Sequence, residues 1–156
     1  MKKFYIFIAI LLGIFLGGCG NSKGSFIKDS ISDYNATVTI SRFTKTLSSK
    51  NYNLISVTNH ETEAIKLQQF LKPTYTVTIN NPKISTKLLE CNPTMALELP
   101  IQIAVYNELN GTTHLAYTNP EYWSLKHNIK NKECIDLVLL MARDFDEATD
   151  SIKKSK

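Results

Sequence analysis

The sequence is poor in the residues that mark small stapled or fibrous proteins, with 3 Cys, 6 Gly and 5 Pro among 156 residues. A disulfide-rich miniprotein and a fibrous repeat protein are therefore excluded. The sequence also lacks a large excess of charge of either sign, since it contains 18 Lys and Arg and 14 Asp and Glu. The lysines are scattered and form no basic stripe, so nucleic acid is not an expected partner. A hydrophobic share of 43% and this length suit one folded domain.

The compact motifs of metal and redox sites are absent as well. None of the patterns H-x-x-x-H, C-x-x-C and H-E-x-x-H occurs, and His60, His114 and His127 lie far apart in the chain. No pair of carboxylates with acid–base spacing stands out, and the sequence contains no recognisable catalytic constellation. We therefore expect no resident metal or other cofactor, and a binding or accessory role in place of an enzymatic one.

No long apolar segment is available to span a bilayer, which takes about 20 residues. The N-terminal apolar run covers only residues 4–16 and follows two lysines, which is typical of a secretory signal. Residues 16–19 (LGGC) then resemble the lipobox of bacterial lipoproteins, in which an aliphatic residue and two small ones precede the cysteine that is lipidated. The alternative is an ordinary secretory signal in which Cys19 is incidental.

The lipobox interpretation divides the chain into four parts. Residues 1–18 form a lipoprotein signal peptide, and the mature chain begins at Cys19, whose several acyl chains would anchor it stably in a membrane. Residues 19–33 are predicted to be the lipidated cysteine and a flexible tether, residues 34–152 a single domain, and residues 153–156 a basic tail. Gly20 in place of aspartate resembles a signal for the outer membrane, with the domain facing the periplasm.

Periodicity beyond residue 33 alternates between strand and helix signals. Alternating residues predict strands over 34–40, 54–58, 74–79, 101–108 and 112–118. Helices are predicted to follow four capping residues: Ser41, Asn59, Asn119 and Asn131. A further short helix holds Leu88 and Leu89, and the last helix, over about 132–152, has an apolar stripe that indicates core packing. The sequence therefore predicts an α+β domain with helices packed on one face of a mainly antiparallel sheet.

Asn110-Gly111, between the last two predicted strands, favours a type I′ hairpin with a two-residue loop. This loop would place Leu109 opposite Thr112 and divide the side chains of the hairpin between two faces. One face would carry Ile103, Val105, Asn107, His114 and Ala116, and the other Ala104, Tyr106, Leu115 and Tyr117. Both faces would be largely apolar. We expect one face to contact the helices and the other to contact a small apolar ligand, a second subunit or another segment.

Cys91 and Cys134 are the two cysteines that remain once Cys19 is lipidated. Export would place them in an oxidising compartment, where an even pair suggests a disulfide. Two buried free thiols are the alternative, because Cys134 lies on an apolar stripe where cysteine packs well. The sequence leaves both alternatives open.

Three short segments together carry a family resemblance. They are residues 81–83 (NPK) after a strand, 96–100 (ALELP) before one, and 117–120 (YTNP) ahead of Lys126 and His127. Their order and spacing resemble the domain of unknown function 302 family over residues 34–152. The resemblance implies a compact α+β domain similar to the TATA-binding-protein arrangement, pairing as a homodimer and without an established activity. The chain departs from the family pattern at Asn80, Glu98 and Lys126, where glycine, aspartate and arginine are usual.

Six side chains are candidates for ligand binding: His60, Lys83, Glu98, Tyr106, Tyr117 and His127. Each has a structural alternative, since His60 and His127 lie near helix ends, and Lys83 and Glu98 could pair with each other. Our leading hypothesis is a lipid-anchored envelope protein that binds a partner or a small ligand. The alternative hypothesis is a metal- or haem-handling or redox protein that uses His60 and His127.

Overall fold

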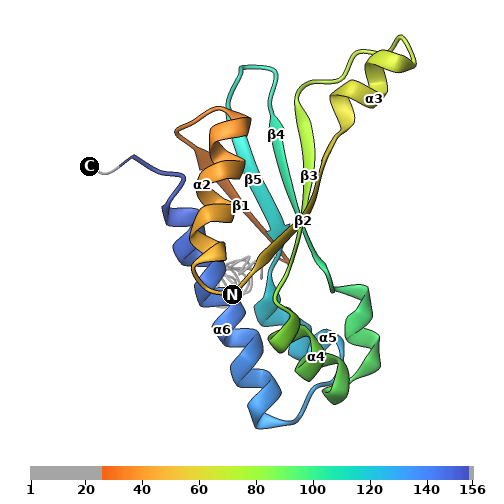
Figure 1. Ribbon diagram of the computed structural model, residues 1–156, viewed down its shortest axis with the longest axis vertical. Coiled ribbons are helices and arrows are strands. Elements are labelled where there is room, and N and C mark those ends of the chain that lie inside the picture. The colour runs from red at the N-terminus through yellow and green to blue at the C-terminus, as the bar shows by residue number, and fades with distance from the viewer. Residues whose placement is uncertain (1–25, 155–156) are drawn as a thin grey trace, which may run out of the picture.

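The computed structural model describes residues 26–154 and shows an antiparallel sheet of five strands in the order β1-β5-β4-β3-β2 (Figure 1). The strands are β1 (Ile27–Ser32), β2 (Asn53–Asn59), β3 (Thr74–Asn80), β4 (Ile101–Asn107) and β5 (Thr113–Thr118). The predicted signal peptide, Cys19 and the last two residues lie outside the described residues. Strands β2 to β5 coincide with predicted strands, whereas β1 does not.

The helices pack on one face of the sheet and around its ends. The two longest, α2 (Ala36–Ser48) and α6 (Lys132–Asp150), lie along one face (Figure 1). Helix α3 (His60–Lys66) stands at one end of the molecule. The other end carries α4 (Pro82–Cys91), η1 (Pro93–Leu97), η2 (Pro120–Tyr122) and α5 (Trp123–Lys126). The predicted α+β single domain with helices on one face is confirmed.

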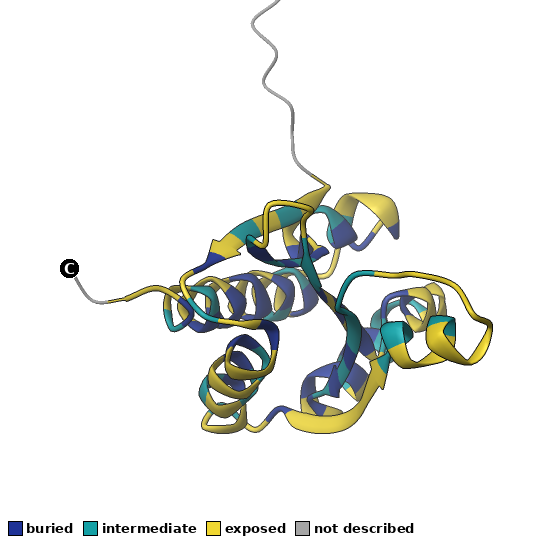
Figure 2. Ribbon diagram, turned by 90° about the horizontal axis from the view of Figure 1, so that it is seen from above, coloured by how far each residue is buried: buried dark blue, intermediate teal, exposed yellow. Residues whose placement is uncertain are grey.

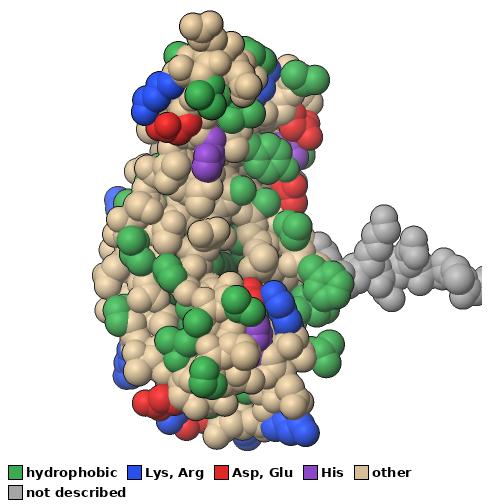
Figure 3. All heavy atoms as spheres, turned by 90° about the vertical axis from the view of Figure 1, so that its right-hand side faces the viewer, with side chains coloured by type: hydrophobic (Ala, Val, Ile, Leu, Met, Phe, Trp, Pro, Cys, Tyr) green, Lys and Arg blue, Asp and Glu red, His purple; other side chains and the backbone are tan. Residues whose placement is uncertain are grey.

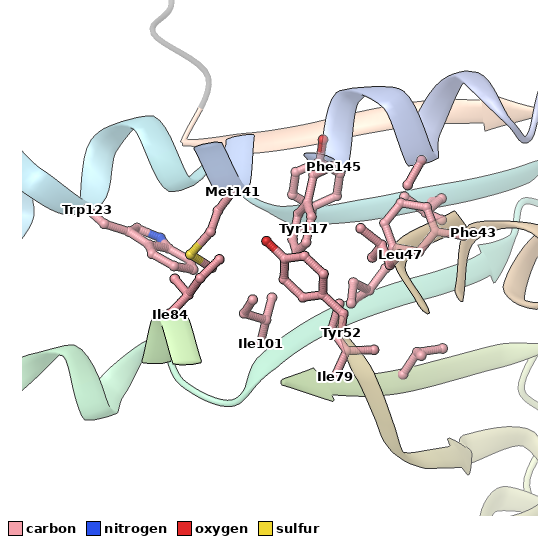
Figure 4. Close-up of a cluster of buried hydrophobic side chains, with 14 of the residues drawn as sticks. Phe43, Leu47, Tyr52, Ile79, Ile84, Ile101, Tyr117, Trp123, Met141 and Phe145 are labelled. Carbon is pink, nitrogen blue, oxygen red and sulfur yellow. The ribbon is translucent and has the colours of Figure 1, made fainter. Parts of the chain in front are cut away.

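The core lies between the sheet and the pair α2 and α6 (Figure 4). Phe43 on α2 and Phe145 on α6 meet with ring centroids 6.0 Å apart, and the ring of Tyr117 on β5 stands edge-on to Phe145 at 5.0 Å. Ile79 and Ile101 supply the floor from β3 and β4. Burying a large apolar side chain contributes about 1.5–3 kcal/mol, so this layer is what holds the helices to the sheet.

Helix α2 begins at Ala36, so the strand predicted over residues 34–40 is wrong. The Asn35 side chain accepts a hydrogen bond from the backbone N–H of Val38 and caps α2. Buried positions Ala36, Thr39 and Phe43 then recur at helical spacing. Tertiary burial of this face outweighs the local β preference of the β-branched residues 37–40, because such preferences amount to only a few tenths of a kcal/mol each.

The segment predicted to be a flexible tether contains an edge strand from Ile27 onward. Strand β1 pairs antiparallel with β5, with Ile27 opposite Thr118 and Ser32 opposite Thr113. The Ser32 hydroxyl lies 2.6 Å from that of Thr39, and the backbone N–H of Asp33 donates to the carbonyl of Ile152. The domain therefore begins several residues before position 34. A segment this polar is stable as a strand because β5 pairs its backbone and because a buried polar side chain such as Ser32 has a hydrogen-bond partner in Thr39.

The β4–β5 hairpin differs from its prediction by one residue of register. Asn107 lies opposite Thr113 and Ile103 opposite Tyr117, so the loop is one residue longer than the predicted two-residue turn. The backbone N–H of Gly111 donates to the carbonyl of Glu108, and Gly111 has φ 86°, the left-handed conformation that closes such a three-residue loop. A shift of one residue on one strand exchanges the faces of all its side chains.

The corrected register separates the two hairpin tyrosines. Tyr117 is buried beneath α2 and α6 together with Ile103, Val105 and Leu115. Tyr106 lies on the opposite, helix-free face with Ala104, His114 and Ala116. The expected sharing of a face by Tyr106 and Tyr117 is therefore wrong. Along β4 and β5, buried residues alternate with intermediate or exposed ones (Figure 2).

Candidate functional site

The helix-free face has a floor of short side chains that crosses the sheet. Thr58, Thr76, Ala104 and Ala116 lie opposite one another on β2, β3, β4 and β5, and Asp29 of β1 ends the row. Such short side chains leave the middle of the face low. Figure 3 shows this face hollowed between the end that carries α3 and the end that carries α4 and α5. The hollow is a candidate binding site.

A stacked aromatic pair borders the floor on the side toward the hairpin loop. Tyr106 and His114 lie opposite each other, with ring centroids 5.1 Å apart and an interplanar angle of 15°. Asp29 holds both: Tyr106 donates its hydroxyl to one carboxylate oxygen, and His114 Nδ1 lies 2.8 Å from the other. The hydrogen bond to Asp29, together with burial and the carboxylate charge, raises the pKa of Tyr106 to about 12.

Two residues beside Tyr106, Asp29 and His114, were not among the candidates predicted from the sequence. Asp29 fell within the predicted tether, and the erroneous register put His114 on the face opposite Tyr106. An alternation of Ile27, Asp29 and Ile31 was the available signal for β1. Only the pairing of β1 with β5 brings Asp29 to the ring pair.

His60 lies at the α3 end of the hollow. It is the first residue of α3, after the capping residue Asn59, and its Nε2 lies 2.8 Å from the Thr76 hydroxyl on the floor. This bond fixes the start of α3 against β3. The rest of α3 and the segment after it bury little, and Ile65, Leu67 and Phe70 are exposed there.

A second polar cluster lies at the opposite end, where Figure 3 shows basic, acidic and histidine side chains close together. Glu98 Oε1 lies 2.6 Å from Lys126 Nζ and 2.9 Å from His127 Nε2. The side chains of Glu98 and His127 are only 5% and 3% exposed. Burial opposes the ionisation of Glu98, but the hydrogen bonds from Lys126 and His127 outweigh it and lower the pKa of this carboxyl. Glu98 is therefore an ionised acceptor at neutral pH.

The other side of the His127 ring leads to the surface. Its Nδ1 lies 2.7 Å from the Thr94 hydroxyl, and Thr94 is exposed. Asn92 caps η1 by accepting from the Thr94 backbone N–H, and its Nδ2 donates to the His127 carbonyl. Thr94 was not among the candidates predicted from the sequence. No local signal would have revealed its contact with His127, because the two residues lie 33 positions apart in the chain.

Lys83 occupies a different part of the molecule from Glu98. It lies in the first turn of α4 and lines a cleft of about 900 Å³ between α4, α6 and the turn after α2. The Lys83 side chain forms no ion pair or hydrogen bond with another residue in the 26–154 range. The pairing of Lys83 with Glu98, which was the structural alternative for both residues, is not formed, because Lys126 contacts Glu98 instead.

The family described as "Domain of unknown function DUF302" matches residues 29–153. The chain belongs to the DUF302 family. The match begins within β1, in agreement with the place of this strand in the domain.

A crystal structure of an uncharacterised conserved DUF302 protein from Bacillus stearothermophilus shares this fold. It superposes with a TM-score of 0.73 at 18% sequence identity, over 83% of this chain and 99% of that chain. At this identity the likeness demonstrates the fold alone. No functionally curated protein matches this DUF302 chain.

The remaining predicted site residues of the DUF302 domain lie in its interior. Tyr117 points into the core, donates its hydroxyl to Asp146, and has its pKa raised to about 12, mainly by burial. Cys91 of α4 and Cys134 of α6 are joined by a disulfide. Of the two alternatives for these cysteines, the structure thus has the bonded one.

The two histidines of the metal or haem hypothesis are not brought together in the DUF302 domain. His60 binds Thr76 near α3, whereas His127 binds Glu98 and Thr94 near α5. Within residues 26–154, no three His, Cys, Asp or Glu side chains are grouped so as to hold a metal ion. The same residues include no helix with the length and apolar character to cross a membrane.

Proposed function

We propose that this DUF302 protein is a lipid-anchored envelope protein that binds a small, partly apolar molecule on the helix-free face of its sheet. The observation that carries the proposal is the hollow over Thr76, Ala104 and Ala116, which no helix of residues 26–154 covers. The methyl groups of the floor residues and the ring of Tyr106 offer apolar contact, while the Thr76 hydroxyl and Asp29 offer hydrogen bonds. Pockets of this mixed character suit small organic ligands.

The two ends of the hollow add exposed apolar surface. Leu97 of η1 and Leu125 of α5 are 79% and 80% exposed at one end. Ile65 and Phe70 are exposed at the α3 end. Scattered apolar side chains on a surface need no explanation, but a set that gathers around a hollow favours an interaction site. The partner should therefore be apolar enough to contact these rims.

The proposed anchor keeps this face near a membrane. Residues 20–25 separate Cys19 from the first described residue, Phe26, so the two lie at most about 25 Å apart along an extended chain. Phe26 is exposed and packs its ring against Tyr122 at 4.8 Å. The Cys91–Cys134 disulfide supports an oxidising compartment such as the periplasm. Gly20 after the lipidated cysteine supports the outer membrane as the destination.

Binding to the hollow can be tested on the mature lipoprotein in mild detergent with the fluorescent probe 8-anilinonaphthalene-1-sulfonate. We expect saturable fluorescence enhancement at one site. Ala104→Arg, which fills the floor, should abolish that enhancement. Leu139→Arg, at an exposed position on α6, is the matched control and should retain it. Equal fluorescence from both variants would contradict the proposed site.

The anchor has a separate test, because it does not depend on the ligand. Cys19→Ser should move the protein from the membrane fraction to the soluble fraction of cells, since no acyl chain can then be attached. Mass spectrometry of the wild-type N-terminal peptide should show an acylated cysteine. An unmodified Cys19 in the membrane fraction would exclude the lipoprotein interpretation and leave the binding face untouched.

The proposal includes pairing of the domain with a second copy through the edge strand β2. Every residue from Asn53 to Thr58 is exposed, and the strand has neither a charge nor a proline. Proteins usually protect such edges, because unpaired backbone groups there recruit another strand. The opposite edge is protected: β1 carries Lys28 and Asp29, and Lys153 reaches the carbonyl of Ile31.

The side chains of β2 are also self-complementary. Leu54 lies opposite Ile79 and Val57 opposite Val77, so both point to the helix side, where no helix covers them. The irregularity in pairing at Ile55 is what keeps Leu54 and Val57 on one side. Two β2 strands paired antiparallel about an axis between Ile55 and Ser56 place each Leu54 opposite the partner's Val57.

Native mass spectrometry of the lipoprotein in mild detergent tests this pairing. We expect a dimer for the wild-type protein, a monomer for Val57→Lys, and a dimer for the control Ile31→Lys on the other edge. Lysine in the β2 edge opposes association by charge repulsion and by the cost of burying an ammonium group. A wild-type monomer at micromolar concentration, or a dimeric Val57→Lys variant, would contradict the interface.

A further inference from the structure

A hydrogen-bonded chain of three side chains runs from the interior to the surface at the α5 end. Glu98 Oε1 lies 2.9 Å from His127 Nε2, and His127 Nδ1 lies 2.7 Å from Thr94 Oγ1. Glu98 and His127 are buried, whereas Thr94 is exposed. The order is thus a buried carboxylate, a buried imidazole and an accessible hydroxyl. These are the distances and the order that a base-activated nucleophile requires.

The hydrogen-bond partners determine the direction of each proton in the chain. The ionised Glu98 carboxylate can only accept, so Nε2 of His127 carries a proton and donates it. In the neutral imidazole, Nδ1 then has a free electron pair that faces the Thr94 hydroxyl. Asn92 Oδ1, at 2.8 Å, is a second acceptor for the same hydroxyl. Asn92 also accepts from the Thr94 backbone N–H, so it holds the threonine in place even when the hydroxyl points to His127.

Two features of the surroundings favour reactivity over a purely structural bond. Lys126 Nζ contacts the same Glu98 oxygen as His127, so the buried carboxylate stays ionised and can orient the imidazole. The exposed Leu97 follows Thr94 by three residues in η1 and offers apolar surface close to the hydroxyl. A link that only tied η1 to α5 would need no accessible hydroxyl group.

We infer that Thr94, His127 and Glu98 form an acyl-transfer site for small carboxylic esters. Thr94 Oγ1 attacks the ester carbonyl carbon, and a carbon–oxygen bond forms while His127 Nδ1 takes the hydroxyl proton. The tetrahedral intermediate then expels the alcohol, which leaves with the proton from His127, and an acyl-threonine remains. Water repeats the sequence with His127 as base and releases the carboxylic acid and free Thr94. Glu98 is a positioning residue that holds the imidazole and stabilises its charged form.

This activity goes beyond the binding role proposed above and does not depend on it. His127 lies 33 residues after Thr94 and 29 after Glu98, so no linear motif reveals the three together. The site also differs from the hollow in the groups that it uses, because none of its three side chains belongs to the floor.

The test uses p-nitrophenyl acetate with the mature lipoprotein in mild detergent. We expect release of p-nitrophenol, with an acetyl group found on Thr94 by peptide mass spectrometry. Thr94→Val preserves the shape of the side chain and should lower the rate by about a hundredfold. Thr94→Ser should restore acetylation at this position, because serine supplies the same nucleophile. Thr86→Val, an exposed threonine on α4, is the control and should leave the rate unchanged.

A structural role for the chain predicts different results. If it only joins η1 to α5, Thr94→Val will release p-nitrophenol as fast as the wild-type protein, and no acetyl group will be found on Thr94 of the wild-type protein. Either result would overturn the inference. Circular dichroism of each variant shows whether the domain remains folded, and His127→Gln provides a second loss-of-base variant. A folded His127→Gln protein that still acetylates Thr94 at the wild-type rate would also overturn it.

Discussion

Glu98 is the residue on which the polar contacts at the α5 end converge. One of its carboxylate oxygens contacts both the Lys126 ammonium and the His127 ring, and the side chain is almost fully buried. A buried carboxylate is costly unless its charge is paired and its oxygens are hydrogen-bonded. Glu98 meets both conditions, so its removal should harm the fold through the partners that it leaves unpaired.

The Glu98→Gln variant tests this contribution through pH. Because the folded-state pKa of Glu98 is lowered, its contribution is full above the ordinary value of 4.5 and is lost as pH falls through the folded value. We expect the variant to lose about 1–3 kcal/mol of unfolding free energy at pH 7. Urea denaturation from pH 7 to pH 3 should show a smaller loss of stability for the variant than for the wild-type protein. Parallel pH curves would contradict the assignment.

Asp29 sets the ionisation of Tyr106 on the helix-free face. The pKa of Tyr106 is raised from 10.0 to about 12, first by its hydrogen bond to Asp29. The stability that this interaction contributes is full below pH 10 and is lost as pH rises through about 12. In an ultraviolet titration of tyrosinate, Asp29→Asn should move one tyrosine toward its ordinary pKa. Tyr106→Phe should remove that transition, and Asp33→Asn should leave it in place.

At the scale of elements, the sequence reveals those whose pattern is set locally. Strand β3 alternates threonine with Tyr75, Val77 and Ile79, and α6 combines the Asn131 cap with a regular apolar stripe. Both were predicted because local preference and burial agree. For α2 the two disagree: the β-branched residues 37–40 favour a strand, but burial of Phe43 and Leu47 against α6 and β4 requires a helix.

The hairpin and the candidate site show what local patterns leave undetermined. Asn110-Gly111 marked the loop correctly, but its length depends on where Gly111 adopts its positive φ, and one residue decides which face Tyr106 occupies. Glu98 and His127 were selected singly as candidates. Their contact, and the places of Thr94 and Asp29 beside their partners, depend on pairings between distant segments. A sequence pattern with a period of a few residues contains no such information.

Strand β1 gives the element-scale prediction. Replacing residues 26–32 by a glycine–serine segment of equal length keeps the reach of the anchor but removes the ladder to β5 and the Ser32–Thr39 contact. We expect a loss of several kcal/mol in the free energy of unfolding, because each lost backbone pair contributes about 1 kcal/mol. Urea denaturation measures the loss. An unchanged midpoint would show that the segment acts as the tether that its polar sequence suggests.

For the whole molecule, the disulfide joins helix α4 to helix α6. Cys91 ends α4 at the lower end of Figure 1, and Cys134 begins α6, which runs along the sheet. The sulfur of Cys134 is fully buried among core residues. A covalent bond between these elements fixes the end of the molecule that carries Thr94, Glu98 and His127 to the helix layer. The bond should therefore stabilise the global fold and this end alike.

The Cys91–Cys134 bond should stabilise the folded domain by an amount that the length of the loop it closes sets. The bond closes a loop with a sequence separation of 43 residues, for which the loop-entropy relation gives about 4 kcal/mol. Cys91→Ala breaks the bond but leaves Cys134 packed in the core, so most of its effect should come from the unfolded chain. We expect a loss of about 2–4 kcal/mol in urea denaturation. The oxidised wild-type protein should lose the same amount when dithiothreitol is added, whereas Cys91→Ala should not respond. If reduction leaves the wild-type midpoint unchanged, the domain does not depend on an oxidising compartment, and the strongest structural support for an envelope location is removed.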